Sequence, residues 1–168
     1  MTETLVQRLQ APIDTLVQQV LAEACERRLR LATAESCTGG LLASVLTDVV
    51  GYSHAFERGF VVYTDEAKHE ALGVAKELLV RHGAVSEPVA MAMAQGALEA
   101  SSADVAVSVT GFAGRGGPGD QPGLVHFAAA RLGRSTRTLR REYGDIGRER
   151  VRLAALTDAL EMFRDQIV

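Results

Sequence analysis

The chain has 168 residues, which suits a single domain spanning residues 1–168, and 47% of them are hydrophobic but only 5% aromatic, so the core must be aliphatic. The formal net charge of −3 argues against a general nucleic-acid binder. The charge is uneven, because residues 1–110 carry 8 basic and 14 acidic side chains whereas residues 111–168 carry 10 and 7. We interpret the arginine excess of the second part as a solvated or subunit-facing surface.

The two cysteines and the apolar runs bear on the cellular location. Cys25 and Cys37 form no CxxC pair, which favours free thiols and a reducing cytoplasm. The segment Met1 to Asp14 lacks the basic stretch and long apolar run of a secretion signal. No apolar run reaches the ~20 residues of a membrane span. We therefore expect a cytoplasmic protein that binds neither membranes nor nucleic acid.

Helical and strand patterns alternate along the chain. Helices show apolar residues at helical spacing and begin at caps or prolines, whereas strands are short apolar runs bounded by turn residues. Residues 111–123 contain six glycines and two prolines and are predicted to form a loop. In chain order we expect helix 12–28, strand 29–34, helix 38–49, strand 59–63, helix 65–72, helix 75–82, helix 86–100, strand 104–110, strand 124–131, strand 136–141 and helix 147–167.

This alternation indicates an α/β fold, a three-layer α/β/α sandwich. The last two strands form a hairpin around Gly133, which makes the sheet mixed rather than purely parallel. We find no internal repeat.

The turn between the first strand and the second helix combines a candidate nucleophile with an anion site. Gly39 and Gly40 let the backbone approach a ligand, and free N–H groups of a first helical turn attract anions. Ser36 is either a nucleophile or a helix cap, and Thr38 could cap in its place. Cys37 is either a small buried apolar residue or the nucleophile of a cysteine hydrolase.

Three segments follow the carboxyl ends of predicted strands, namely 36–38, 63–64 and 110–111. Open α/β sheets bind ligands at that edge, so these segments are predicted to face one pocket. The segments bring Tyr63 and Thr110 near Ser36.

Lys68 is one of only two lysines beside sixteen arginines. A buried lysine can lose its proton and act as a base, which arginine cannot do. The alternative is a surface lysine paired with Asp65 or Glu66, since structural ion pairs are common.

The glycine loop after strand 104–110 is predicted to form a backbone wall for a ligand, or a phosphate nest, the alternative being an ordinary surface loop. Arg115 within it favours an anionic ligand. Glu35 is either an acid or a residue that orients the turn. The histidines lack metal-ligand spacing, so we expect no metal and no cofactor.

Several motifs in one order carry a resemblance. The chain resembles the C-terminal domain family of the competence/damage-inducible protein CinA over residues 12–167, nearly its whole length. One departure is Arg115, where the family commonly has proline. The matching segments are 34–40 (AESCTGG), 59–63 with 66–68, 83–86 (GAVS), 109–114 (VTGFAG) and 148–152.

The resemblance implies an α/β/α sandwich, usually oligomeric, here in the stand-alone form without the additional N-terminal domain of many members. It implies an amidohydrolase that converts nicotinamide mononucleotide (NMN) and water to nicotinic acid mononucleotide and ammonia, in pyridine-nucleotide salvage, without metal. We expect a homo-oligomer, most simply a dimer. The alternative function is a non-catalytic nucleotide-binding regulatory module linked to competence or DNA damage.

Resemblance and residue chemistry together give each candidate a role. Ser36 would attack the amide, Lys68 would take its proton, and Tyr63 would relay that proton or orient Lys68. Backbone N–H groups from Cys37 to Gly39 would hold the oxyanion. Direct attack by water, without an acyl-enzyme, is the alternative mechanism. The expected substrate-binding residues are Glu35, Cys37, Thr38, Gly39, Gly40, Thr110, Gly111, Gly114 and Arg115.

Overall fold

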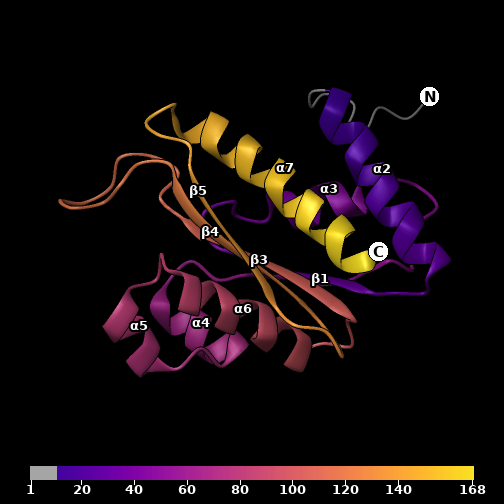
Figure 1. The fold of residues 1–168 in the computed structure, drawn as a ribbon, viewed down its shortest axis with the longest axis horizontal. Coiled ribbons are helices and arrows are strands. Elements are labelled where there is room, and N and C mark those ends of the chain that lie inside the picture. Colours follow the sequence, from indigo (N-terminus) through magenta and orange to yellow (C-terminus); the bar gives the residue numbers. More distant parts are fainter. Residues whose placement is uncertain (1–10) are drawn as a thin grey trace.

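The computed structural model describes residues 11–168, which form a five-stranded sheet between two layers of helices (Figure 1). The predicted α/β class and mixed sheet are confirmed. The elements in chain order are α2 (Ala11–Glu26), β1 (Leu31–Glu35), α3 (Leu41–Thr47), β2 (Phe56–Val61), α4 (Asp65–Leu72), α5 (Lys76–His82), α6 (Glu87–Glu99), β3 (Val105–Gly111), β4 (Leu124–Arg131), β5 (Arg137–Glu142) and α7 (Arg148–Ile167).

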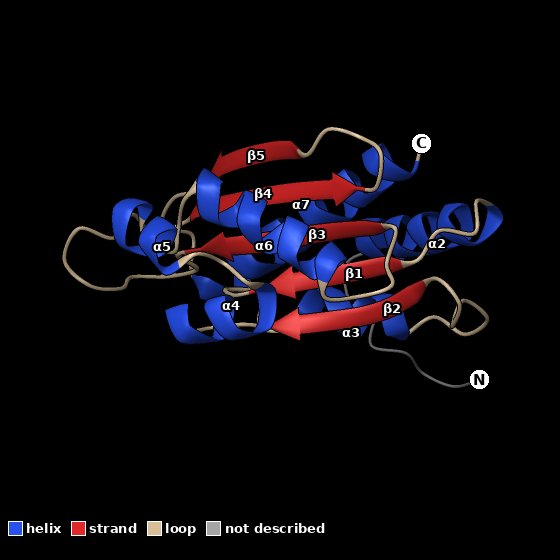
Figure 2. Ribbon diagram, turned by 90° about the horizontal axis from the view of Figure 1, so that it is seen from below, coloured by secondary structure: helices blue, strands red, loops and turns tan. Residues whose placement is uncertain are grey.

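The sheet order is β2-β1-β3-β4-β5. The first three strands are parallel and the last two antiparallel. Glu35 at the end of β1 lies opposite Val61 at the end of β2 and Val109 of β3, and β3 continues to Gly111, so the three carboxyl ends lie at the same edge with β3 reaching furthest (Figure 2). The chain segments that follow these strands therefore meet at one edge of the sheet.

Helices α2, α3 and α7 cover one face of the sheet, and α4, α5 and α6 cover the other (Figure 1). The core of both faces is aliphatic, as the composition predicts, with Phe127 and Phe163 as its large aromatic members. No helix within residues 11–168 has the length and apolarity that a membrane crossing requires.

The helix after β1 begins at Leu41, three residues later than the apolar pattern predicts. Gly39 and Gly40 take positive φ values of 61° and 91°, which are left-handed conformations that interrupt a right-handed helix. The prediction that the helix starts at Thr38 is therefore wrong, and residues 36–40 form a turn of their own. This difference changes which N–H groups are free at the site.

Candidate functional site

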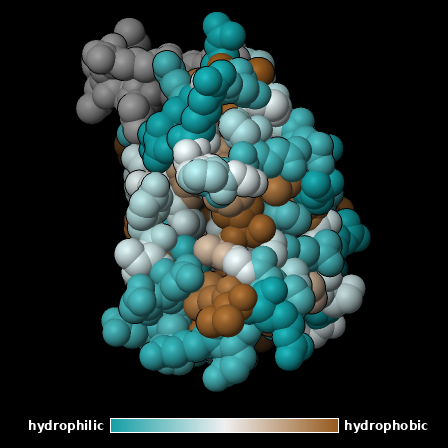
Figure 3. Space-filling view, turned by 90° about the vertical axis from the view of Figure 1, so that its left-hand side faces the viewer, coloured by the Kyte–Doolittle hydropathy of each residue, from teal (hydrophilic) through white to brown (hydrophobic). Residues whose placement is uncertain are grey.

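A cavity of about 350 Å³ lies at the carboxyl ends of β1, β2 and β3. The three predicted segments do meet there, and Figure 3 faces this end of the molecule, where apolar surface shows among hydrophilic residues. The expected site residues that line it are Ser36, Cys37, Tyr63, Lys68, Thr110, Gly111, Gly114 and Arg115.

Lys68 is buried, with only 1% of its surface exposed. Thr64 caps α4 by accepting the N–H of Ala67, and this places Lys68 in the first turns of the helix, beneath the end of β2. Its Nζ lies 3.2 Å from the Ser36 Oγ and 3.1 Å from each of two carbonyl oxygens, those of Val62 and Tyr63. The alternative of a solvated lysine paired with Asp65 or Glu66 is wrong.

These three oxygens suit both protonation states of Lys68, because an ammonium can donate one N–H to each of them. A neutral amine has two N–H groups and one lone pair. In the neutral form the two carbonyls, which can only accept, take the two N–H groups, and the lone pair is left for the proton of the Ser36 hydroxyl. Burial lowers the pKa of Lys68, against the opposing effect of the Asp65 carboxylate and of Cys37.

Ser36 is 7% exposed and its N–H donates to the Val109 carbonyl, which ties it to β3. Its hydroxyl faces Lys68 instead of capping α3. Tyr63 contacts Lys68 through its main-chain carbonyl, while its own side chain is largely exposed at the cavity. Tyr63 therefore orients Lys68 by its backbone.

Glu35 is fully buried and does not line the cavity. Its Oε2 accepts the N–H groups of Gly40 and Leu42 at 3.1 and 3.0 Å, and its Oε1 accepts that of Ala43 at 2.8 Å. The carboxylate therefore occupies the start of α3, where we expected a ligand anion. Of the two interpretations of Glu35, the structure supports the one in which it orients the turn.

The backbone N–H groups of Cys37 and Thr38 donate to no other residue within the described part of the chain. Gly39 donates to the Ser36 carbonyl at 3.2 Å and Gly40 to Glu35, so neither is free to bind a ligand. Of the N–H groups expected to bind the oxyanion, those of Cys37 and Thr38 therefore remain available, and that of Gly39 does not. The Thr38 hydroxyl is buried without a partner and caps nothing.

Cys37 is buried beside Ser36. Burial raises the pKa of its thiol to about 12; its own backbone N–H lowers it, Glu35 raises it further, and the cations Arg148 and Arg152 lower it. A thiol of this kind is protonated at neutral pH, which argues against the cysteine-hydrolase hypothesis.

The glycine loop and the start of α7 form the far wall of the cavity. Arg115 is bound to Asp145 at 2.8 Å, so its charge is already compensated. Arg148 lines the same cavity and has no ion-pair partner among the described residues. Sequence reasoning did not assign Arg148 to the site, although it lies in a segment that matches the family. Thr110 donates its hydroxyl to the Ala84 carbonyl and so fixes the loop before α6.

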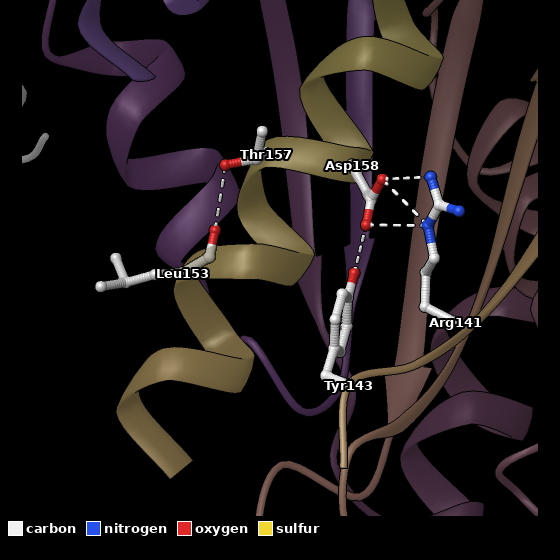
Figure 4. Close-up of polar contacts among 5 residues, drawn as sticks. All are labelled: Arg141, Tyr143, Leu153, Thr157 and Asp158. Carbon is white, nitrogen blue, oxygen red and sulfur yellow. Dashed lines mark hydrogen bonds and ion pairs between the residues drawn. The ribbon is translucent and has the colours of Figure 1, made fainter. Parts of the chain in front are cut away.

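A polar cluster anchors α7 to β5 and its following turn (Figure 4). Asp158 on α7 accepts two hydrogen bonds from Arg141 at Nε and one at Nη2, and a short one from the Tyr143 hydroxyl. This anchor sets the position of the helix that carries Arg148. Among residues 11–168 no three His, Cys, Asp or Glu side chains are grouped to hold a metal ion.

Comparison with known proteins agrees with this geometry. The model of the CinA C-terminal domain matches residues 13–167. The chain belongs to the CinA C-terminal domain family. A crystal structure of the competence/damage inducible protein CihA from Agrobacterium tumefaciens superposes with a TM-score of 0.91, at 42% identity and with 98% of each chain covered.

Curated relatives of this family differ in length. The nicotinamide-nucleotide amidohydrolase PncC of Escherichia coli K12 is 47% identical over 91% of this chain and 93% of its own. A CinA-like protein of Akkermansia muciniphila is 54% identical over 74% of this chain. The chain spans about three tenths of the length of the first curated relatives it matches, including this one.

Proposed function

We propose that the protein is an amidohydrolase that converts NMN and water to nicotinic acid mononucleotide and ammonia, in pyridine-nucleotide salvage. The observation that carries the proposal is the buried Lys68, whose Nζ lies 3.2 Å from the Ser36 hydroxyl and whose other neighbours are carbonyls. The similarity to nicotinamide-nucleotide amidohydrolase PncC supplies the substrate.

In the first step the Ser36 Oγ attacks the carboxamide carbon while its proton passes to the neutral Lys68 amine. The carbonyl oxygen becomes an oxyanion, which the N–H groups of Cys37 and Thr38 would hold. The protonated Lys68 then gives its proton to the amide nitrogen, the C–N bond breaks, and ammonia leaves. The Tyr63 carbonyl keeps Lys68 in line through both transfers.

In the second step water attacks the acyl-enzyme and Lys68 accepts its proton. The ester bond to Ser36 breaks, the serine recovers a proton from Lys68, and the nucleotide leaves as a carboxylic acid that gives its proton to the solvent. Direct attack by water activated by Lys68 would give the same products without an acyl-enzyme, and trapping of a Ser36 ester by rapid quench and mass spectrometry distinguishes the two routes.

The ribose phosphate would lie against the far wall. Arg148 supplies an uncompensated charge there, and the backbone at Gly111 and Gly114 allows close approach. A Cβ added at Gly111 would lie 2.7 Å from the Leu124 carbonyl oxygen, so glycine is needed where β3 and β4 lie this close together. The regulatory-module alternative uses the same wall but assigns no task to Lys68.

Ammonia release from NMN by the purified protein, with chromatography of the nucleotide product, tests the proposal. We expect nicotinic acid mononucleotide without added metal and full activity in EDTA. Absence of product from well-folded protein would favour the regulatory module, and loss in EDTA restored by a divalent ion would contradict the metal-free mechanism.

We also propose that the protein is a cytoplasmic homo-oligomer, most simply a dimer, with no nucleic acid or membrane as partner. Both cysteines are free, as a reducing compartment requires. Light scattering tests the assembly, because a mass of 17.9 kDa at micromolar concentration would contradict it.

A further inference from the structure

Arg152 lies on α7, one helical turn beyond Arg148, and its side chain contacts the turn formed by residues 36–40. Its Nη2 donates to the Thr38 carbonyl at 2.7 Å, across 114 positions of sequence. It is not part of the cavity lining. The same Nη2 lies beside Gly39, since a Cβ added to that glycine would stand 3.6 Å from it.

The peptide unit between Thr38 and Gly39 is held at both ends. Its carbonyl oxygen accepts Arg152 at 2.7 Å and the N–H of Leu41 at 3.2 Å, and the Ser36 carbonyl accepts its N–H at 3.2 Å. A peptide unit is planar, so fixing both ends fixes its orientation. That orientation matters because two glycines in left-handed conformations follow, and glycine gives a turn little stiffness of its own.

The buried Glu35 and the partly buried Arg152 therefore hold this turn from opposite sides. Glu35 holds the N–H groups of Gly40, Leu42 and Ala43 at the downstream end. Arg152 holds the carbonyl just upstream. Between the two anchors and Ser36, only the N–H groups of Cys37 and Thr38 are left to face a ligand.

We infer that Arg152 is a positioning residue that acts through the Thr38 carbonyl and aligns the N–H groups of Cys37 and Thr38 on the oxyanion. The inference rests on the proposed function for its catalytic consequence. The anchoring itself is a property of the folded protein. The Arg152 Nε is buried without a partner, and the bond from Nη2 to the Thr38 carbonyl is the hydrogen bond that its side chain makes within residues 11–168.

The experiment compares three variants of the full chain with wild type. Arg152→Gln removes the charge and shortens the reach, Arg152→Lys keeps one charged donor, and Arg150→Gln is the matched control, because Arg150 is exposed on the same helix. Initial rates against NMN give kcat and KM. Hydrogen exchange followed by mass spectrometry reports on the amides of Gly39 and Gly40, and thermal melts check folding.

We expect Arg152→Gln to lower kcat about 100-fold, the cost of a small misplacement in an active site, with KM nearly unchanged and faster exchange at Gly39 and Gly40. Arg152→Lys should recover part of both effects, and Arg150→Gln should match wild type. A rise in KM with kcat unchanged would mean that Arg152 contacts the substrate, and unchanged exchange would mean that it does not hold the turn. Either result overturns the inference.

The two proposals fail separately. If wild-type protein releases no ammonia from NMN, the proposed function is wrong, while the exchange comparison still decides whether Arg152 anchors the turn. If Arg152→Gln does not fold, Arg152→Lys carries the same comparison, with a smaller loss of kcat and a smaller rise in exchange expected. A Lys variant identical to wild type in kcat, KM and exchange, beside an unfolded Gln variant, would assign Arg152 to stability alone.

Discussion

Replacing Lys68 with arginine separates a base from a simple cation. The lysine Nζ lies within 3.2 Å of the Ser36 Oγ and within 3.1 Å of the carbonyls of Val62 and Tyr63. Arginine keeps the charge and offers more donors, but it stays protonated at any working pH and cannot accept the serine proton. A binding cation would tolerate this exchange, whereas a base would not.

The expected loss follows from the role. Positioned proton transfer contributes about 10²- to 10⁴-fold to a rate, so Lys68→Arg should lower kcat/KM by at least about 100-fold and nearly as far as Lys68→Met. Methionine has a similar length and no proton to exchange, which makes it the matched neutral control. Substantial activity in Lys68→Arg would refute proton transfer by this residue.

The pH dependence gives a second measurement on the same side chain. Burial lowers the pKa of Lys68, so its neutral form is populated at a lower pH than an ordinary lysine would allow. The base is the neutral form, and wild-type kcat/KM should therefore rise with pH through the lowered pKa. A flat profile, measured where the fold is intact, would contradict the mechanism.

The same shift links pH to stability. Between the lowered pKa and the ordinary value of about 10.4, the unfolded chain binds a proton at Lys68 that the folded chain does not. The free energy of unfolding should therefore rise with pH across that window, by up to about 1.4 kcal/mol per pH unit. Lys68→Met should remove this rise, which urea titrations at several pH values would show.

Three further predictions follow from the cavity and its turn. Ser36→Ala should lose several orders of magnitude in kcat whereas Cys37→Ala should stay active in steady-state assays, and the reverse order would make the thiol the nucleophile. Arg148→Ala should raise KM for NMN about tenfold or more, while Arg115→Ala should change it little because Asp145 already compensates that charge; equal effects in kinetic assays would contradict this assignment. Glu35→Gln should destabilise the fold by about 2 kcal/mol in urea titration, because three N–H groups lose a charged acceptor, and an unchanged midpoint would argue against the cap.

The meeting of Ser36, Tyr63 and Thr110 could be predicted from the sequence, since each lies at or just after the carboxyl end of a strand and parallel strands end at the same edge. The rarity of lysine drew attention to Lys68, but its burial could not be predicted, because pairing with Asp65 or Glu66 satisfies the same local pattern. Only the three-dimensional path of α4 beneath β2 decides between these outcomes.

The direction of the Glu35 side chain could not be predicted either. Residues of a strand alternate between faces, so a carboxylate beside a glycine turn can face the ligand or the helix that follows. The outcome depends on the left-handed φ values of Gly39 and Gly40, which delay α3 to Leu41 and bring its N–H groups to the carboxylate. Arg148 was missed for another reason, because α7 reaches the cavity only through the packing of the whole sheet.

Ser36 and Cys37 are adjacent in sequence, and thiolates are the stronger nucleophiles, so chemistry alone would favour the cysteine. Their surroundings reverse that preference. The hydroxyl has a buried amine 3.2 Å away that can take its proton, whereas burial moves the pKa of the thiol to about 12 and no base contacts it among the described residues. In the proposed mechanism serine ionises only in the transition state, as Lys68 receives its proton, whereas the cysteine would have to lose its proton without a base. The position of Lys68 therefore favours Ser36 over Cys37 as the proposed nucleophile.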